Sequence, residues 1–447
     1  MVRPIRLVDF GSTYTKVAAV DVEQDILLGT AQAFTTLEDI ALGLERATCL
    51  LLAKTGPLAF EQTLACSSAA GGLSMVAIGL VPSLTEKAAR LACFGAGAKI
   101  SKSYAYELTE ADAEEIKALE PDIVLLTGGT DGGNQQTIVH NARMLASIKK
   151  RIPIVVAGNR SAAFQIRKIL QGEEAFFCEN VMPALNELNL EPVKETIRTL
   201  FLNKIVKAKG FERQNILMPT PVAVLEALSL LASDWGDLLA IDVGGATTDV
   251  YSLAPGRPKS DTVLLKGAAE PYAKRTVEGD IGMRCNASGI VEAVGFEALS
   301  KLAGPAFAAF LEKINRDPNY LPNPKERKCD SALAFGAVKT AVLRHAGQLE
   351  AVYTPIGQAF FQSGKDLREV GALILTGGAL IYGSDLDLVA KAACFDEKAP
   401  QFLKPCKPKA FIDKHYLLAA MGLLANDYPR TALALMKKEL HSYEIKG

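Results

Sequence analysis

The chain has 447 residues, of which 49 % are hydrophobic and 22 % are charged. This length allows two or three domains, each large enough to bury a core, and the composition excludes an intrinsically disordered chain. Its 49 basic and 50 acidic residues leave a formal net charge of −1, which argues against a large non-specific nucleic-acid surface, because such a surface needs excess Lys and Arg.

The spacing of cysteines and histidines predicts a reduced, cytoplasmic protein without a structural zinc site. The eight cysteines form no CxxC pair, and the four histidines form neither HxxH nor HExxH. Scattered cysteines with apolar neighbours are typical of reduced core residues. The first residues lack the apolar core of a signal peptide, and no window approaches the roughly 20 apolar residues of a transmembrane helix.

The first predicted element is a β-hairpin over residues 5–20. Two apolar runs flank a polar turn that contains Asp9, Gly11, Ser12 and Thr13. Such a pattern is typical of two antiparallel strands with an exposed tip.

Helices and strands alternate further along the chain, which predicts an α/β fold with helices on the faces of the sheets. The turn at residues 234–237 is the predicted domain boundary. The expected elements are a helix over 110–119, a strand over 123–126, a helix over 137–148, a strand over 153–157, a helix over 161–170, an apolar helix over 221–231 and another over 416–426.

The first hairpin has a counterpart 233 residues later. Four residues recur in register, namely Asp9, Gly11, Thr15 and Val17 as Asp242, Gly244, Thr248 and Val250. A second pair of similar segments, 124–129 (VLLTGG) and 373–378 (LILTGG), lies 249 positions apart. Two motifs that repeat in the same order indicate two related α/β halves; chance similarity is the alternative. We predict domains at 1–233 and 234–410, and a segment at 411–447 whose helices pack back on the first domain.

Both hairpin tips have the composition of a phosphate-binding turn. Glycine permits close approach of the backbone to a ligand, and successive amides with Ser or Thr hydroxyls form a nest for anions. The carboxylates would hold Mg²⁺ through water molecules. Two such tips that face each other across a cleft would clamp a polyphosphate. The alternative is a pair of ordinary tight turns with capping aspartates.

The order of these motifs resembles that of the sugar-kinase, heat-shock-70 and actin superfamily (ASKHA). The resemblance implies duplicated ribonuclease H-like halves with an ATP and Mg²⁺ cleft between two domains. It also implies that residues 221–231 and 419–422 are connecting helices. Ala246 replaces a glycine of the heat-shock version, which leaves the phosphate pocket more crowded. The implied ligand contacts are Asp9, Gly11, Ser12 and Thr13 in the first hairpin, Asp242, Gly244, Gly245, Ala246, Thr247 and Asp249 in the second, and Gly377, Gly378 and Ala379 at the adenosine.

A narrower resemblance is to the accessory protein of adenosylcobalamin-dependent glutamate mutase, a family called MutL or GlmL. It implies an ATPase-like chaperone that reactivates a mutase whose damaged cobalamin is stuck, with the mutase subunits as partners. The chain has no DxHxxG motif, so cobalamin is expected on the partner. The segments that carry the resemblance are 65–73 (ACSSAAGGL), 125–134 (LLTGGTDGGN), 242–252, 275–284 (RTVEGDIGMR) and 344–347 (RHAG).

Hydrolysis needs a carboxylate that orients or deprotonates water, and Mg²⁺ against the leaving charge. By motif position, Asp9, Asp242 and Asp249 are the candidate catalytic residues, and Asp9 and Asp242 the candidate metal ligands. A strand-end hydrogen bond is the alternative for Asp249. Glu278 or Asp280 could serve the metal or the ribose, whereas a helix N-cap explains Asp280 equally well.

Three other segments have structural alternatives. Residues 125–134 include the predicted first-domain counterpart of the adenosine turn, and they form either a partner contact or lid, or a structural glycine turn. Cys66, Ser67 and Ser68 are interpreted as core residues, because no His or Asp is placed to activate them. Arg344 and His345 are expected at a helix C-terminus, where cations are favoured.

Three functions remain open at the level of sequence. The first is a nucleotide-driven reactivating chaperone. The second is a small-molecule kinase, although no acceptor-binding cluster of the sugar-kinase type is recognisable. The third is a non-enzymatic scaffold of the actin type. None of the three is expected to bind nucleic acid or membrane.

Overall fold

The computed structural model describes residues 4–36, 40–68, 73–148, 150–205, 216–260, 262–354 and 357–446. The chain divides into two compact units, the first formed by 1–21, 28–223 and 267–269 and the second by 22–27, 224–266 and 270–447. The chain passes from the first unit to the second within helix α8 (Thr220–Trp235), between Ala223 and Val224. The domain limits proposed above stay a prediction.

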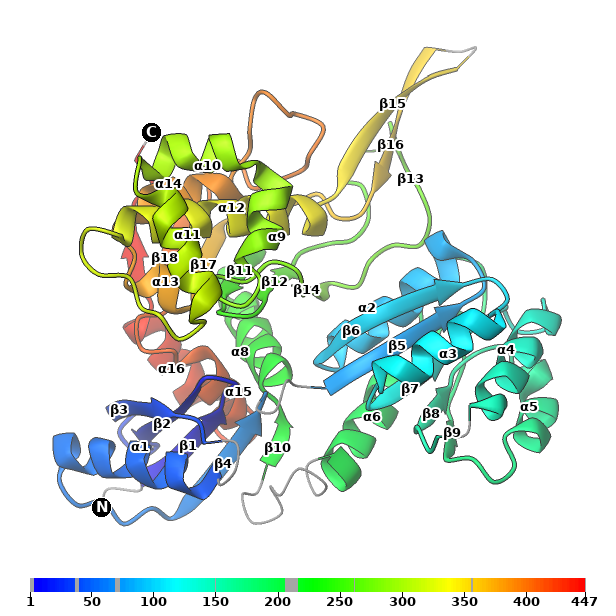
Figure 1. The fold of residues 1–447 in the computed structure, drawn as a ribbon, viewed down its shortest axis with the longest axis horizontal. Helices are drawn as coiled ribbons and strands as arrows, with labels where there is room; N and C mark the ends of the chain where they lie inside the picture. The colour runs from blue at the N-terminus through cyan, green and yellow to red at the C-terminus, as the bar shows by residue number, and fades with distance from the viewer. Residues whose placement is uncertain are drawn as a thin grey trace. The chain divides into compact units, whose positions relative to one another are not determined.

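The first sheet of the first unit has the strand order β10-β4-β1-β2-β3. The predicted hairpin is confirmed, since β1 and β2 pair antiparallel, whereas β1 with β4 and β4 with β10 are parallel pairs. Helix α1 (Ile40–Thr55) packs on β2 (Figure 1). The strands are β1 (Pro4–Phe10), β2 (Tyr14–Asp21), β3 (Ile26–Phe34), β4 (Gln62–Ser67) and β10 (Ile216–Pro219).

A second, fully parallel sheet lies between β4 and β10 in the sequence, with the order β6-β5-β7-β8-β9. Its strands are β5 (Leu73–Gly79), β6 (Ala98–Ala105), β7 (Ile123–Leu126), β8 (Ile154–Val156) and β9 (Ala175–Phe177). Its helices are η1 (Pro82–Glu86), α2 (Lys87–Gly95), α3 (Glu110–Leu119), α4 (Gln136–Ser147), η2 (Arg160–Ala162), α5 (Ala163–Ile169), α6 (Glu191–Leu200) and η3 (Phe201–Ile205).

Both faces of this parallel sheet are buried at its central strands. All four residues of β7 are buried, and alternate ones join different cores, with Ile123 and Leu125 in one and Val124 and Leu126 in the other. Continuous apolar strands of this kind are typical of parallel sheets covered by helices on both sides. The elements predicted between residues 110 and 170 are confirmed here.

The second unit contains a six-stranded sheet with the order β14-β12-β11-β17-β18-β19, and helix α12 packs on β11 and β12 (Figure 1). Its strands are β11 (Leu238–Val243), β12 (Thr248–Leu253), β14 (Ala273–Glu278), β17 (Ala372–Thr376), β18 (Lys409–Ile412) and β19 (His441–Tyr443). Its helices are α9 (Ala287–Val294), α10 (Phe296–Ala303), α11 (Phe307–Arg316), α12 (Arg327–His345), α13 (Gly378–Ile381), α14 (Leu386–Ala393), α15 (Leu418–Ala425) and α16 (Pro429–Glu439).

The predicted internal repeat is confirmed by sheet topology. The series β3-β2-β1-β4-β10 matches β14-β12-β11-β17-β18, with an antiparallel first hairpin and parallel fourth and fifth strands in both. The register agrees as well, because Asp9 stands beside Cys66 on the parallel neighbour, as Asp242 stands beside Thr376. The α/β fold with two like halves is therefore the fold of this chain.

The second sequence repeat was interpreted wrongly. Strand β7, which leads into Thr127-Gly128-Gly129, belongs to the parallel sheet, whereas the topological counterpart of β17 is β4. An apolar run that ends in Thr-Gly-Gly is compatible with any buried parallel strand, so this local pattern does not identify the sheet to which a strand belongs. The segment after β4, residues 69–72, lies outside the described residues.

The cysteines are free, as expected, but Cys49, Cys285 and Cys406 are exposed, which contradicts the prediction that they are core residues. Among the described residues, no helix has both the length and the hydropathy needed to cross a membrane.

Candidate functional site

The first tip, which we define as residues 11–14, is closed by a hydrogen bond from the Gly11 amide to the Tyr14 carbonyl at 3.1 Å. A Cβ atom on Gly11 would lie 2.6 Å from that same carbonyl oxygen. Only glycine therefore fits this turn without moving the backbone. Ser12 and Thr13 are exposed at its end.

Two further carbonyl groups of the first tip, those of Gly11 and Thr13, accept hydrogen bonds from Thr35. The Thr35 hydroxyl donates to the Gly11 carbonyl at 2.8 Å, and the Thr35 amide donates to the Thr13 carbonyl at 2.9 Å. In a trans peptide the N–H points opposite to the preceding C=O. The amide of Ser12 consequently points away from Thr35, where it is able to donate to an anion. The Tyr14 amide instead faces β1, because the Tyr14 carbonyl already pairs with Gly11 across the hairpin.

The side chain of Asp9 lies at the base of this tip and is 6 % exposed. Its Oδ1 accepts a hydrogen bond from the Thr220 hydroxyl at 2.6 Å, and its Oδ2 accepts one from the Lys16 ammonium at 3.4 Å. The Cys66 thiol is 3.7 Å from Oδ1. Burial, and then the negative charge of Asp9, raise the pKa of Cys66, so the thiol stays protonated, in agreement with its interpretation as a core residue.

Sequence reasoning missed Lys16 and Thr220. Lys16 was available, because the hairpin register places it directly opposite Asp9. Thr220 was not, since it directly follows β10, a strand two places away from β1 in the sheet, and is 211 positions away in the chain.

The second tip, residues 244–247, repeats the same turn. The Gly244 amide donates to the Thr247 carbonyl at 2.9 Å, and a Cβ on Gly244 would lie 2.9 Å from that oxygen. Three successive carbonyls of the tip accept donors from the segment that follows β14, namely Gly244 from the Met283 amide at 3.1 Å, Gly245 from the Arg284 amide at 2.8 Å and Ala246 from the Asn286 side chain at 2.7 Å. The amides of residues 245–247 therefore all point to the opposite side.

The segment 275–284 packs against the carbonyl side of the second tip and is fixed by an ion pair at each end. At its start, Arg275 forms a buried ion pair with Asp249 at 2.6 Å, and at its end Arg284 pairs with Asp330 of α12 at 2.7 Å. A Cβ on Gly282 would lie 2.3 Å from the Ala246 carbonyl. The neighbouring segment thus approaches the backbone of Ala246 so closely that position 282 requires glycine.

Two predicted carboxylates meet in this hairpin, because Asp242 and Asp249 stand directly opposite each other on β11 and β12. Asp249 accepts hydrogen bonds from Arg275 at 2.8 Å and from the Thr247 hydroxyl at 3.3 Å. Burial would lower the pKa of Arg275, but Asp249 and Tyr251 raise it overall. These contacts favour the alternative that Asp249 is a structural partner of Arg275. Within the described ranges, no group of three or more His, Cys, Asp or Glu side chains has a metal-binding arrangement.

Glu278 and Asp280 both bind one arginine. Arg344, in the last turn of α12 as predicted, donates to Glu278 at 2.8 Å and to Asp280 at 2.7 Å. The hydrogen bond from Arg344 is the main cause that lowers the pKa of Asp280. The N-cap expectation for Asp280 was wrong, because α9 begins after Asn286.

The predicted adenosine turn lies at the base of the second tip. Thr376 stands beside Asp242 on the neighbouring strand, and a Cβ on Gly377, whose φ is +104°, would lie 2.4 Å from the Val243 carbonyl. Gly378 begins the short helix α13 and approaches the Tyr416 hydroxyl. Tyr382, at the end of α13, is 63 % exposed, and sequence reasoning missed it although it follows the turn closely.

Residues 125–134 form a glycine turn fixed by its neighbours. The Asn159 amide group donates to the Gly133 and Asn134 carbonyls at 3.0 Å, and its oxygen accepts the Gly132 amide at 3.1 Å. Asn180 donates to Asp131 at 2.9 Å. These bonds favour the structural alternative for this segment.

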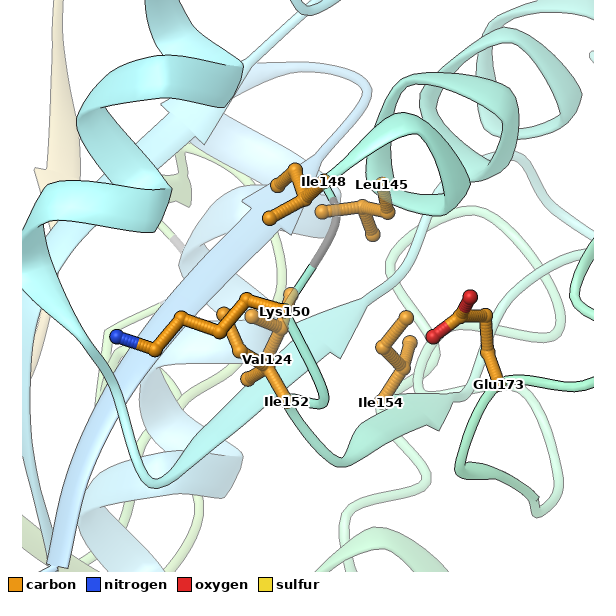
Figure 2. Close-up of a pocket in the computed structure, with 7 residues that line it drawn as sticks. All are labelled: Val124, Leu145, Ile148, Lys150, Ile152, Ile154 and Glu173. Atoms are coloured by element: carbon orange, nitrogen blue, oxygen red, sulfur yellow. The ribbon is translucent and has the colours of Figure 1, made fainter.

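A small pocket in the same parallel sheet is unrelated to either tip (Figure 2). Its wall is apolar apart from two charged residues, and it contains none of the predicted site residues. It is lined by Val124, Leu145, Ile148, Lys150, Ile152, Ile154 and Glu173.

The structure thus groups the predicted site residues into two sets, one in each unit. Asp9, Gly11, Ser12 and Thr13 form the first set. The second is Asp242, Gly244, Gly245, Ala246, Thr247, Asp249, Gly377, Gly378 and Ala379.

Fold and site together define an α/β protein with two like sheets, each of which ends a hairpin in a glycine turn with outward-pointing amides. Residues 5–440 match the family described as MutL protein. The chain is 46 % identical over 459 residues to Protein MutL of Clostridium tetanomorphum, covering 97 % of this chain and 98 % of that one. The chain belongs to the MutL family.

Solved structures resemble the chain more distantly. The alignment with the nucleotide-free structure of acetone carboxylase covers 95 % of this chain and 70 % of the acetone carboxylase chain, with 12 % sequence identity and a TM-score of 0.41. Gluconate kinase from Lactobacillus acidophilus matches 99 % of this chain and 93 % of its own, with 11 % identity and a TM-score of 0.37.

Proposed function

We propose that this protein binds ATP with Mg²⁺ through its two tips, and that nucleotide-dependent closure of its halves assists or reactivates an adenosylcobalamin-dependent mutase of the glutamate mutase type. One observation carries the proposal: the same glycine-closed turn is built twice, at equivalent positions of two like sheets. Membership of the MutL family supports the choice of partner.

In this proposal the tips bind the phosphates. The Ser12 amide and hydroxyl and the Thr13 hydroxyl contact the terminal phosphates from the first unit, and the amides of 245–247 contact them from the second. Fixed donors of this kind stabilise charge without reorganising when it develops. The turn at Gly377, Gly378 and Ala379 would hold the adenosine, where the exposed ring of Tyr382 offers a surface for stacking.

Asp242 and Asp9 would have different roles in hydrolysis, the first toward the metal and the second toward the attacking water. Bound Mg²⁺ supplies positive charge against the leaving phosphate, and Asp242 would hold its water ligands from the second unit. Asp9 would orient the attacking water and take up its proton. The hydroxyl of Thr220 and the ammonium of Lys16 fix the Asp9 carboxylate for that role. Asp249 would act by keeping Arg275, and through it β14, in place.

Helix α8 offers a route from the nucleotide to domain closure. Its first residue, Thr220, bonds to Asp9, and the helix then passes from the first unit into the second. A change in Asp9 on nucleotide binding or hydrolysis would therefore alter the start of a helix shared by both units. Hinges at element ends are a common means of domain closure. The domains would be 1–233 and 234–410, with 411–447 connecting back, and the protein would act in the cytoplasm.

The test is ATP turnover by the purified protein, measured as phosphate release without any small acceptor, with and without the mutase. We expect slow turnover that the mutase alters. Asp9→Ala should lower it by roughly 10²–10⁴-fold, the contribution of a general base, and Asp242→Ala should lower it as well, because the metal would lose its support. Asp427→Ala, at an exposed site, should leave it unchanged.

Three results would contradict the proposal. One is unchanged turnover in Asp242→Ala, which would remove Asp242 from the site. Another is ADP release that depends on an added sugar or carboxylate, which would indicate a kinase. The third is ATP-dependent sedimentation as filaments without turnover, which would indicate a scaffold.

A further inference from the structure

A three-stranded sheet in the second unit stands apart from the six-stranded one. It has the order β13-β16-β15, formed by β13 (Val263–Leu265), β15 (Gln348–Thr354) and β16 (Gly357–Ser363). These strands pack chiefly on one another, and the β15–β16 hairpin extends beyond the helices of its unit (Figure 1). We call this sheet the arm.

The arm exposes apolar side chains. Tyr353 is 84 % exposed, Leu264 is 52 % exposed and Phe360 is 36 % exposed. Its register places Ala351 and Phe360 opposite each other on one face, next to Val263. Tyr353 and Phe360 therefore share one face of the arm, whereas Leu264, which stands beside Phe361, lies on the other. Exposed apolar residues that share a face are typical of interaction surfaces.

Strand β15 forms one edge of the arm, and the hydrogen bonds at its base show which groups face outward. The Leu349 amide donates to the Gln401 carbonyl at 2.9 Å, and Gln348 bridges antiparallel to Phe402. Outward and inward backbone groups alternate along an antiparallel strand. Ala351 and Tyr353 therefore present the next outward N–H and C=O groups, and the strand already accepts an antiparallel neighbour at its base.

This edge lacks the usual protection against pairing. Edge strands commonly carry lysines, proline or bulges that prevent association. Strand β6, at the edge of the parallel sheet, has Lys99 and Lys102 and a register shift. Strand β15 has no lysine, arginine or proline. Its one charge, Glu350, is paired with Lys266 at 3.2 Å.

We propose that β15 pairs antiparallel with β15 of a second copy of this chain, which joins the two arms into one six-stranded sheet. The outward groups allow one register that avoids the occupied Leu349 amide: Ala351 opposite Tyr353 of the second copy, with Val352 on the two-fold axis. This register gives four backbone hydrogen bonds, places each aromatic ring beside a small side chain, and does not set the two Glu350 side chains against each other.

A second copy is the occupant because the edge is self-complementary. Ala351 of each copy pairs with Tyr353 of the other, so the outward N–H and C=O groups of both residues all form hydrogen bonds. The one charged residue of the arm strands, Glu350, is paired with Lys266, which directly follows β13, and a neutral apolar surface fits another of the same kind. This inference is independent of the proposed ATPase role.

The test is sedimentation of the full chain over a concentration range of about 1–100 µM, where an interface of modest size dissociates. We expect a monomer–dimer equilibrium. Ala351→Pro removes an outward amide but no bond to β16, and should weaken the dimer at least about tenfold. Tyr353→Lys introduces the charge that edge strands use against pairing, and should do the same. Ala351→Thr and Tyr353→Thr, which keep the outward amides, should still dimerise.

A wild-type chain that stays monomeric throughout would overturn the proposal, as would a dimer that survives both Ala351→Pro and Tyr353→Lys. The far-UV circular dichroism of each variant should match the wild type. If Ala351→Pro misfolds, the Tyr353 pair of variants alone decides the outcome.

Discussion

The glycines that begin the two tips could not be replaced by other residues without a change in backbone geometry. A Cβ atom added to Gly11 or to Gly244 would lie less than 3 Å from a backbone carbonyl oxygen. Because each glycine closes its turn, the carbonyls face one side and the amides the other. The chemical capacity of both tips therefore follows from the absence of a side chain at one residue in each.

Lys365 makes folding depend on pH. Its side chain is fully buried, and its ammonium donates to the Ser252 and Tyr272 carbonyls at 3.1 and 2.5 Å. Burial, aided by the charge of Lys274, lowers its pKa from 10.5 to about 7. Above about pH 7 the unfolded state then binds more protons than the folded state, so the free energy of unfolding should rise with pH.

The urea midpoint should therefore increase between pH 7 and about 8.5, a window chosen to end where unfolded cysteines titrate. Lys365→Met should flatten this increase. His345 contributes little in this window, because it is neutral in the folded state and its unfolded form titrates near pH 6.5, below the window. A wild-type midpoint that is flat or falls across the window would show that Lys365 stays charged.

At the scale of elements, the second tip depends on the segment 275–284. Arg284 forms an ion pair with Asp330. Burial raises the pKa of the Asp330 carboxyl, and the opposing effect of the Arg284 charge is smaller. Loss of one partner of a buried pair leaves the other charge without compensation, which costs about 3–5 kcal/mol. Exposed pairs contribute far less.

We expect Arg284→Met to lower the free energy of unfolding by about 3 kcal/mol or more. The double variant Arg284→Met/Asp330→Leu should recover much of this loss, because no buried charge is then left without a partner. Lys117→Met, which breaks an exposed pair with Glu114, should cost under about 1 kcal/mol. Urea unfolding measures all of these variants. Equal costs for Arg284→Met and Lys117→Met would mean that the segment does not depend on this pair.

The sequence predicted the elements that depend on local pattern. Both hairpins, the helix Glu110–Leu119 and the register of Asp9 with Asp242 followed from residue types alone. It failed where the order of strands in space decides, as for β7, whose Thr-Gly-Gly end belongs to another sheet. It also missed Thr220 and Arg275, because contacts across neighbouring strands leave no periodic signal.

At the scale of the whole molecule, the Thr220–Asp9 hydrogen bond connects the candidate catalytic carboxylate to the helix that enters the second unit. Thr220→Val keeps the shape of the side chain but removes this donor. We expect ATP turnover to fall by about 10–100-fold while nucleotide affinity changes less, since a positioning residue affects the reacting geometry more than binding.

Thr262→Val, at an exposed hydroxyl bonded to Ser260, is the matched control and should behave as the wild type. If Thr220→Val lowers affinity and leaves turnover of the bound nucleotide intact, Thr220 belongs to the binding surface and not to the coupling between units.

Nucleotide-dependent closure of the kind proposed requires that both tips bind the same triphosphate. The most direct measurement is a crystal structure with a non-hydrolysable ATP analogue and Mg²⁺. We predict phosphate oxygens within hydrogen-bonding distance of the Ser12 amide and of the amides of residues 245–247 together, with the metal on the Asp242 side. A nucleotide held by one tip alone, or bound elsewhere on the chain, would contradict it.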